Sequence, residues 1–270
     1  MLFDLIRPIN VFLGMISVLV ISPTLDNINI YFTIIVVSSF IAISNIINDL
    51  FDQKTDKING RQKILKSKIL YVYFLLIFLL FIGIFSAFKL NFYSQIITLI
   101  FVLPLILLYT PIFKGIPILG NVIVSILVAN VFIFTEISIY QKIKFSLLPF
   151  FFAFITTLIR EIIKDLEDVK GDKENHITTF PVLYGEYKAR VICLFLMLFL
   201  NIIVLIPYFL GFYNMIYLLT VIIGVILPNS YCIKYIIKNR YKYNYRFIQN
   251  FQKKITFIGL IIIYLMKNNF

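Results

Sequence analysis

The sequence predicts an all-α, polytopic membrane protein with nine transmembrane helices, arranged as two repeated four-helix units around a central cavity. The composition indicates the membrane. Of the 270 residues, 61% are hydrophobic and 14% are charged, whereas charged residues make up about a quarter of a typical soluble domain. Two further observations, a repeated acidic motif and basic residues confined to alternate loops, predict how the helices are arranged.

Apolar segments close to the length of a transmembrane helix, about 20 residues, recur along the whole chain. The first follows Asp4 and Arg7 but ends without the small residues of a signal-peptide cleavage site, so we expect it to be retained. Cys193 and Cys232 fall within expected helices, where buried thiols are more common than disulfides. We expect transmembrane helices over residues 9–28, 30–48, 69–88, 92–109, 118–137, 146–163, 189–210, 212–233 and 251–266.

Basic residues alternate between loops in the way that sets membrane orientation. With the N-terminus in the cytoplasm, all of the 25 lysines and arginines lie on the cytoplasmic side except Lys89, Lys142, Lys144 and Lys267. The sequence therefore predicts a multi-pass protein of the cell membrane whose acidic motifs face the cytoplasm. Its formal charge of +12 suits an anionic leaflet or an anionic substrate, and basic residues in short loops give no reason to expect nucleic acid.

An acidic motif occurs twice, 116 positions apart. Residues 48–59 read NDLFDQKTDKIN, and residues 164–175 read KDLEDVKGDKEN. Each copy follows the second helix of a predicted four-helix unit. We therefore divide one domain, residues 1–270, into repeats of about 1–116 and 117–233 and a ninth helix over 251–266. An even number of helices separates the copies, so they share one orientation and can face each other across a cavity.

Positions four residues apart in each motif lie on one face of a continuing helix. Carboxylate and amide oxygens are ligands typical of Mg²⁺, which is usually shared with substrate phosphates. A solvated helix end is the alternative for a single copy, but it explains two matched copies poorly. Zinc and haem sites built from several His or Cys ligands are not expected, since the chain has one histidine. The expected metal ligands are Asn48, Asp49, Asp52, Asp56, Asp168 and Asp172.

Over essentially its whole length, the chain resembles the UbiA superfamily of intramembrane prenyltransferases. The matching residues are Asn48, Asp52 and Asp56 with Asp168 and Asp172, YTPIFK at 109–114, Gly120-Asn121, and Arg7-Pro8 with Asn10. REIIKDLEDVKGD at 160–172 is most similar to the archaeal branch, whose members transfer a geranylgeranyl group onto geranylgeranylglyceryl phosphate. The chain departs from the family at 57–64, where KINGRQKI replaces the usual Arg-Ile-Asn-Arg-Pro-x-Arg-Pro.

The resemblance implies a reaction in which Mg²⁺, held by both motifs, neutralises the leaving diphosphate of geranylgeranyl diphosphate. The product would carry the second ether bond of an archaeal-type lipid. Tyr109 is implied to hydrogen-bond the diphosphate or stack near the reacting carbon, and Asp165 or a neighbouring carboxylate to take the proton of the acceptor. The implied substrate-binding residues are Arg61, Lys63 and Lys114 for the diphosphate, Arg160 and Lys164 for the acceptor's phosphate, and Asn10 and Asn121 at the membrane boundaries.

Other acceptors and other classes of protein stay open at the level of sequence. Related enzymes prenylate aromatic rings in quinone, tocopherol or haem pathways with the same diphosphate motifs. A divalent-cation transporter is the non-enzymatic alternative, although transport favours acids near mid-membrane. A CDP-alcohol phosphotransferase is not expected, since the string Asp-Gly-x-x-Ala-Arg is missing. The expected partners are geranylgeranyl diphosphate, a lipid-phosphate acceptor and membrane lipid, and homo-oligomerisation is left open.

Overall fold

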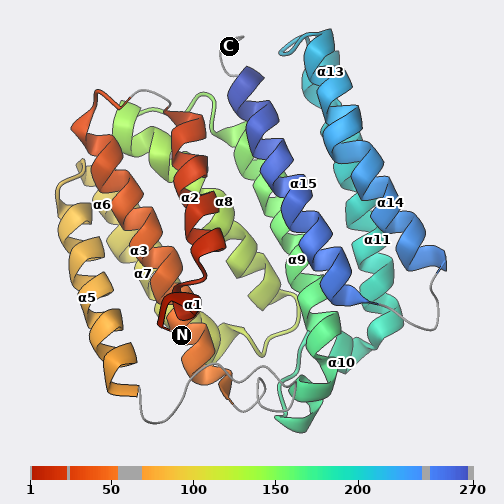
Figure 1. Ribbon diagram of the computed structural model, residues 1–270, viewed down its shortest axis with the longest axis horizontal. Helices are drawn as coiled ribbons and strands as arrows, with labels where there is room; N and C mark the ends of the chain where they lie inside the picture. Colours follow the sequence, from red (N-terminus) through yellow and green to blue (C-terminus); the bar gives the residue numbers. More distant parts are fainter. Residues whose placement is uncertain (1, 23–24, 54–68, 239–243, 267–270) are drawn as a thin grey trace.

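The computed structural model describes residues 2–22, 25–53, 69–238 and 244–266. All regular structure within these ranges is helical (Figure 1), which confirms the all-α prediction. Three segments, η2 to η4, are π-helical turns that continue α-helices. In chain order the elements are α1 (Leu2–Ile6), α2 (Pro8–Ile21), α3 (Ile28–Phe51), α5 (Ile69–Phe88), α6 (Phe92–Gln95), η2 (Ile96–Val102), α7 (Leu103–Leu108), η3 (Tyr109–Phe113), α8 (Leu119–Tyr140), α9 (Leu147–Glu174), α10 (Phe180–Tyr184), α11 (Glu186–Ile203), α12 (Ile206–Phe209), α13 (Met215–Val221), η4 (Ile222–Ile226), α14 (Leu227–Lys238) and α15 (Tyr245–Met266).

Six helical segments of the described chain are long and apolar enough to cross a membrane. The other three predicted ranges also lie in helices, but α2 has only 14 residues, and α9 and α15 carry charged side chains over part of their length. The number of crossings therefore stays a prediction. The six segments are Ile28–Phe51, Ile69–Phe88, Phe92–Phe113, Leu119–Tyr140, Glu186–Phe209 and Met215–Lys238.

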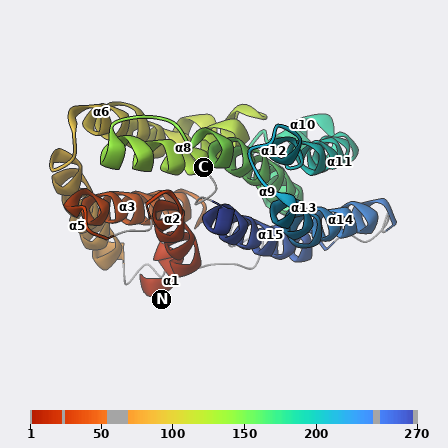
Figure 2. The same cartoon turned by 90° about the horizontal axis from the view of Figure 1, so that it is seen from above.

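The helices form two rows when the molecule is seen from above (Figure 2). One row contains α6, α8, α9 and α11, and the other contains α3, α2, α15 and α14. Between the rows α2 packs against α8 and α15 packs against α9, and within one row α15 packs against α2. Together the rows surround a central cavity of about 600 Å³.

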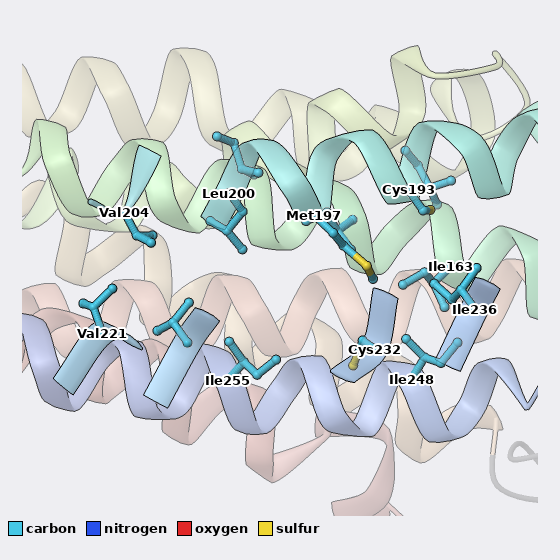
Figure 3. Close-up of a cluster of buried hydrophobic side chains, with 14 of the residues drawn as sticks. Ile163, Cys193, Met197, Leu200, Val204, Val221, Cys232, Ile236, Ile248 and Ile255 are labelled. Carbon is cyan, nitrogen blue, oxygen red and sulfur yellow. The ribbon is translucent and has the colours of Figure 1, made fainter. Parts of the chain in front are cut away.

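The C-terminal half is held together by an apolar cluster between α9, α11, α14 and α15 (Figure 3). Met197 and Cys193 of α11 point from one side toward Cys232 and Ile236 of α14 (Figure 3). Both cysteines are free and buried, as predicted. Dispersion contacts in such a dry cluster stabilise helix packing where lipid offers no hydrophobic driving force.

A buried amide network crosses the same half of the bundle. Asn229 on α14 donates to the Met197 carbonyl and to Asn201 Oδ1, both at 2.8 Å, on α11. Gln252 on α15 donates to Asn229 Oδ1 at 2.9 Å. Because an unsatisfied buried amide is costly, these bonds fix α15 against α11 and α14.

Candidate functional site

One end of the central cavity is lined by polar side chains. They come from the beginnings of α2 and α15, from the end of α3 and from the second half of α9. Apolar residues of α2, α8 and α15, such as Leu13, Phe134 and Leu260, line the part farther from this end. The cavity can therefore hold a ligand with a polar head and a long apolar tail.

The first acidic motif reaches the cavity through Asn48 and Asp52. Both lie at the C-terminal end of α3, where the Asp52 amide donates to the Asn48 carbonyl. Lys114 donates to Asp52 Oδ1, and Thr110 donates to Asn48 Oδ1 at 3.3 Å. The segment at 109–114, which the sequence associates with the diphosphate, thus lies against this motif.

The sequence predicts that Asp49 binds a metal ion, but in the structure Asp49 pairs with Arg7. Its Oδ1 accepts a 2.6 Å hydrogen bond from Arg7 Nη2 within an ion pair, and the residue is only 2% exposed. Arg7 lines the cavity, whereas Asp49 does not. Asp49 therefore holds Arg7 in place, and its predicted role as a metal ligand stays untested.

The second motif presents Lys164 and Asp168 to the cavity. Lys164 Nζ lies 3.5 Å from Glu161 Oε2, one turn earlier on α9. Asp172 lies outside the lining, buried, and accepts a 3.2 Å hydrogen bond from Thr179 Oγ1. Its burial raises the pKa of its carboxyl to about 6.

Asp165 and Asn121 form a contact between α9 and α8. Asn121 Nδ2 donates to Asp165 Oδ2 at 2.8 Å, and neither residue lines the cavity. Asp165 lies beyond the apolar part of α9, and its removal from water raises the pKa of its carboxyl to about 7. A carboxyl with this pKa is suited to accept a proton near neutral pH, although the cavity-facing carboxylate nearby is Glu161.

Of the twelve predicted site residues in the described ranges, seven line this cavity. Asn10, Tyr109 and Arg160 line it together with the motif residues described above. The sequence reasoning missed Arg246, Gln249 and Lys253, which also line it. Their spacing of three and four residues on α15 is the pattern of one helix face and could have been noticed. Asp56, Arg61 and Lys63, all predicted site residues, lie outside the described part of the chain.

The oxygen donors at this end fit Mg²⁺ by their chemistry. Asn48, Asp52 and Asp168 line the same cavity, and Mg²⁺ typically takes one or two carboxylates and completes its shell with water and substrate phosphates. Within the described ranges no three His, Cys, Asp or Glu side chains converge on one metal position. A metal at this site would therefore depend on phosphate oxygens for part of its coordination.

The sequence profile of the UbiA prenyltransferase family matches residues 10–256. The chain belongs to the UbiA prenyltransferase family. With its six long apolar helices, it is a multi-pass membrane prenyltransferase of that family.

Curated members of the UbiA family resemble the chain over most of its length. Digeranylgeranylglyceryl phosphate synthase of Methanobrevibacter smithii is 30% identical over 235 residues, which are 83% of each chain. The enzyme of the same name from Sulfurisphaera tokodaii is 36% identical over 200 residues, 72% of this chain and 71% of the other.

Solved structures of the family have the same arrangement of helices. A structure described as digeranylgeranylglyceryl phosphate synthase in membranes has a TM-score of 0.75 at 28% identity, covering 98% of this chain and 96% of the other. A UbiA homologue from Archaeoglobus fulgidus, bound to DMAPP and Mg²⁺, has a TM-score of 0.65 at 17% identity and covers 99% of both chains. The second likeness establishes the fold alone.

Proposed function

We propose that this chain transfers a geranylgeranyl group from geranylgeranyl diphosphate to geranylgeranylglyceryl phosphate, with Mg²⁺ as cofactor and diphosphate as by-product. The new ether bond would be the second of an archaeal-type membrane lipid. The observation that carries the proposal is the single cavity shared by both acidic motifs and a group of cations. The curated relatives named digeranylgeranylglyceryl phosphate synthase support the choice of acceptor.

The two acidic motifs are proposed to hold the metal and the diphosphate. Asn48, Asp52 and Asp168, which share the cavity, are the proposed metal ligands, with Asp172 and Asp56. When bound, Mg²⁺ supplies positive charge that stabilises the departing diphosphate. Lys114, already beside Asp52, adds a fixed positive charge on the same side.

The remaining residues are proposed to orient the substrates. Tyr109 lies on the cavity wall, where its hydroxyl can donate to a diphosphate oxygen. Asn10 on α2 and Asn121 on α8 are proposed to bind substrate through their amides. Arg61 and Lys63 are proposed to contact the diphosphate. Once the allylic carbon is electrophilic, the acceptor hydroxyl attacks it and loses its proton to Asp165, or to a carboxylate near it.

The architecture proposed for the whole chain is one domain of nine transmembrane helices. Its repeats are about 1–116 and 117–233, with α15 as the ninth helix, and the cavity opens toward the cytoplasm. Support comes from helices in all nine predicted ranges of the described chain and from the basic residues on alternate loops.

The test is turnover of purified protein with Mg²⁺, geranylgeranyl diphosphate and one acceptor at a time. We expect diphosphate release with geranylgeranylglyceryl phosphate and none above background with 4-hydroxybenzoate. Turnover with the aromatic acceptor alone would overturn the choice of acceptor. Asp52→Ala and Asp168→Ala should each lower turnover by at least about a hundredfold, because each removes a charge that stabilises the leaving group. Near-normal turnover in either variant would argue against a site formed by the two motifs. Mg²⁺ transport into liposomes, without diphosphate release from any acceptor, would favour the transporter alternative.

A further inference from the structure

The face of α15 that meets the cavity carries two cations on either side of Gln249, which donates to Glu167 Oε2 of α9 at 2.7 Å, and none of the proposed roles uses the two cations. Arg246, Gln249 and Lys253 all line the cavity. They lie on one face of the helix because they are spaced by three and four residues. Arg246 is exposed and Lys253 is partly buried, so the face runs inward from the mouth of the cavity. At 1.5 Å per residue, Lys253 is about 10 Å deeper than Arg246.

Lys253 faces an excess of positive charge. Arg160, Arg7 and Lys164 act on it electrostatically, and Glu161 is the one carboxylate among the groups that do so. Glu161 itself pairs with Lys164, and Arg7 pairs with Asp49. Within the described part of the chain, no carboxylate lies within ion-pair distance of Arg160 or Lys253. Several cations gathered in a low-dielectric cavity repel one another unless an anion is bound between them.

Arg7 is fixed at the same end of the cavity. Its Nη2 donates to Asp49 Oδ1 at 2.6 Å, while its side chain lines the cavity and is 30% exposed. The guanidinium therefore presents positive charge to the cavity, and its other Nη N–H groups can donate to an anion there.

Arg160 and Lys253 lie at a membrane boundary, where a charged side chain is costly unless it reaches water or faces the protein interior. The two residues lie at the cytoplasmic ends of the ranges 146–163 and 251–266, which the sequence predicts to cross the membrane. Ionisable side chains in such positions face the bundle interior and mark the paths of substrates or ions. Lys254, the next residue, is exposed and does not line the cavity, so the helix directs one lysine inward and the other outward.

We propose that α15 supplies the binding site for the acceptor's phosphate, formed by Lys253 with Arg160 and Arg7 and reached past Arg246. This inference rests on the proposed function, because it assumes that the second substrate is a lipid carrying a phosphate monoester. The diphosphate is assigned to Asp52 and Asp168, which line the same cavity, and to Lys114 beside Asp52. Two separate sites keep the diphosphate and the acceptor's phosphate apart, because two anions repel each other strongly in a low dielectric.

The test compares Lys253→Gln with Lys254→Gln, which removes the same charge one residue away. The binding probe is an alkylglycerol phosphate, and the control probe is the same alkylglycerol without the phosphate. Thermal protection of the purified full chain in detergent is measured with each. We expect the phosphate probe to protect the unaltered protein and Lys254→Gln, and the half-saturating concentration to rise about tenfold to a hundredfold in Lys253→Gln. Lys253→Arg should retain most of the protection because it keeps the charge.

Kinetics with both substrates then distinguish the binding site from a general defect. In Lys253→Gln the KM for geranylgeranylglyceryl phosphate should rise about tenfold to a hundredfold, while the KM for geranylgeranyl diphosphate stays within about threefold. An equal rise in both KM values, or equal protection by the charged and uncharged probes, would overturn the inference. If the unaltered protein does not turn over the phosphate acceptor, the proposed function fails, and the protection measurements still decide whether α15 binds a phosphate.

Discussion

A carboxylate of the first acidic motif can either bind the metal or hold another side chain in place, and the ion pair of Asp49 with Arg7 assigns Asp49 to the second role. We expect Asp49→Asn to lower the stability of the fold and to leave the Mg²⁺ dependence of turnover unchanged. Asp52→Asn, three residues away on the cavity wall, should raise the Mg²⁺ concentration for half-maximal turnover by about tenfold or more, because a carboxylate that binds the metal is lost. The two substitutions are chemically identical, so they differ only in where the side chain lies.

The size of the stability loss follows from the geometry of the pair. Arg7 Nη2 and Asp49 Oδ1 are 2.6 Å apart, with side-chain exposures of 30% and 1%. Removing one partner from a buried ion pair costs about 3–5 kcal/mol. The asparagine keeps an oxygen that accepts the Arg7 hydrogen bond, and Arg7 is partly hydrated. We therefore expect a loss of about 1–2 kcal/mol for Asp49→Asn, close to the difference between a charge-assisted and a neutral hydrogen bond.

The assay combines initial rates over a Mg²⁺ titration with the apparent melting temperature in detergent. For Asp49→Asn the half-saturating Mg²⁺ concentration should stay within about twofold of the unaltered protein, while the melting temperature falls, as the loss of about 1–2 kcal/mol requires. A tenfold shift in the half-saturating concentration with an unchanged melting temperature would refute the reasoning. Asp49 would then be a metal ligand, as its place in the motif first suggested.

The remaining predictions concern helix packing and proton transfer. In Gly83→Ala the new Cβ would lie 2.7 Å from the Phe40 ring, so we expect a loss of about 1–3 kcal/mol in thermal unfolding. Gly259→Ala, with no atom within 4 Å of the new Cβ, should be neutral or stabilise by up to about 1 kcal/mol, and equal melting temperatures in the two variants would contradict this. With Asp165 as the proton acceptor and the pKa of its carboxyl raised to about 7 by burial, kcat/KM should fall as the pH drops below about 7 and the carboxyl becomes protonated. Asp165→Asn should remove this limb with at least about a hundredfold loss of turnover, and an unchanged pH profile would transfer the role to Glu161.

The helices could be predicted because the apolar segments are long and clearly separated, and because the repeated motif groups them into two units. All nine predicted ranges contain helix in the described chain. Their bounds were predicted less well. The helix expected over 9–28 ends at Ile21, because it is followed by Ser22 and Pro23. The helix expected over 146–163 continues to Glu174, because the polar motif prolongs it beyond the apolar stretch that hydropathy detects.

The site could be predicted where residues act through local spacing, and not where they act through tertiary contacts. Asn48, Asp52 and Asp168 share the cavity, as the two matched motifs suggest. The motif pattern could not reveal that Asp49 faces Arg7, since that contact spans 42 positions of the sequence. Lys253 was missed for a related reason. In a basic, apolar segment it resembles any lysine at a membrane boundary, until α15 is placed beside α9.

The amide network of the C-terminal half has a consequence for how the protein is made in the membrane. On its own, α15 is a weak membrane helix, since Lys253 and Lys254 shorten its apolar stretch and Gln252 adds a polar group. The buried amide of Gln252 can donate to Asn229 only after α14 is in place, where Asn229 in turn donates to Asn201 on α11. Insertion of the last helix is thus coupled to packing of the helices before it. The cavity wall that carries Lys253 is completed last, so a nascent chain that stalls before α15 leaves the bundle open on one side.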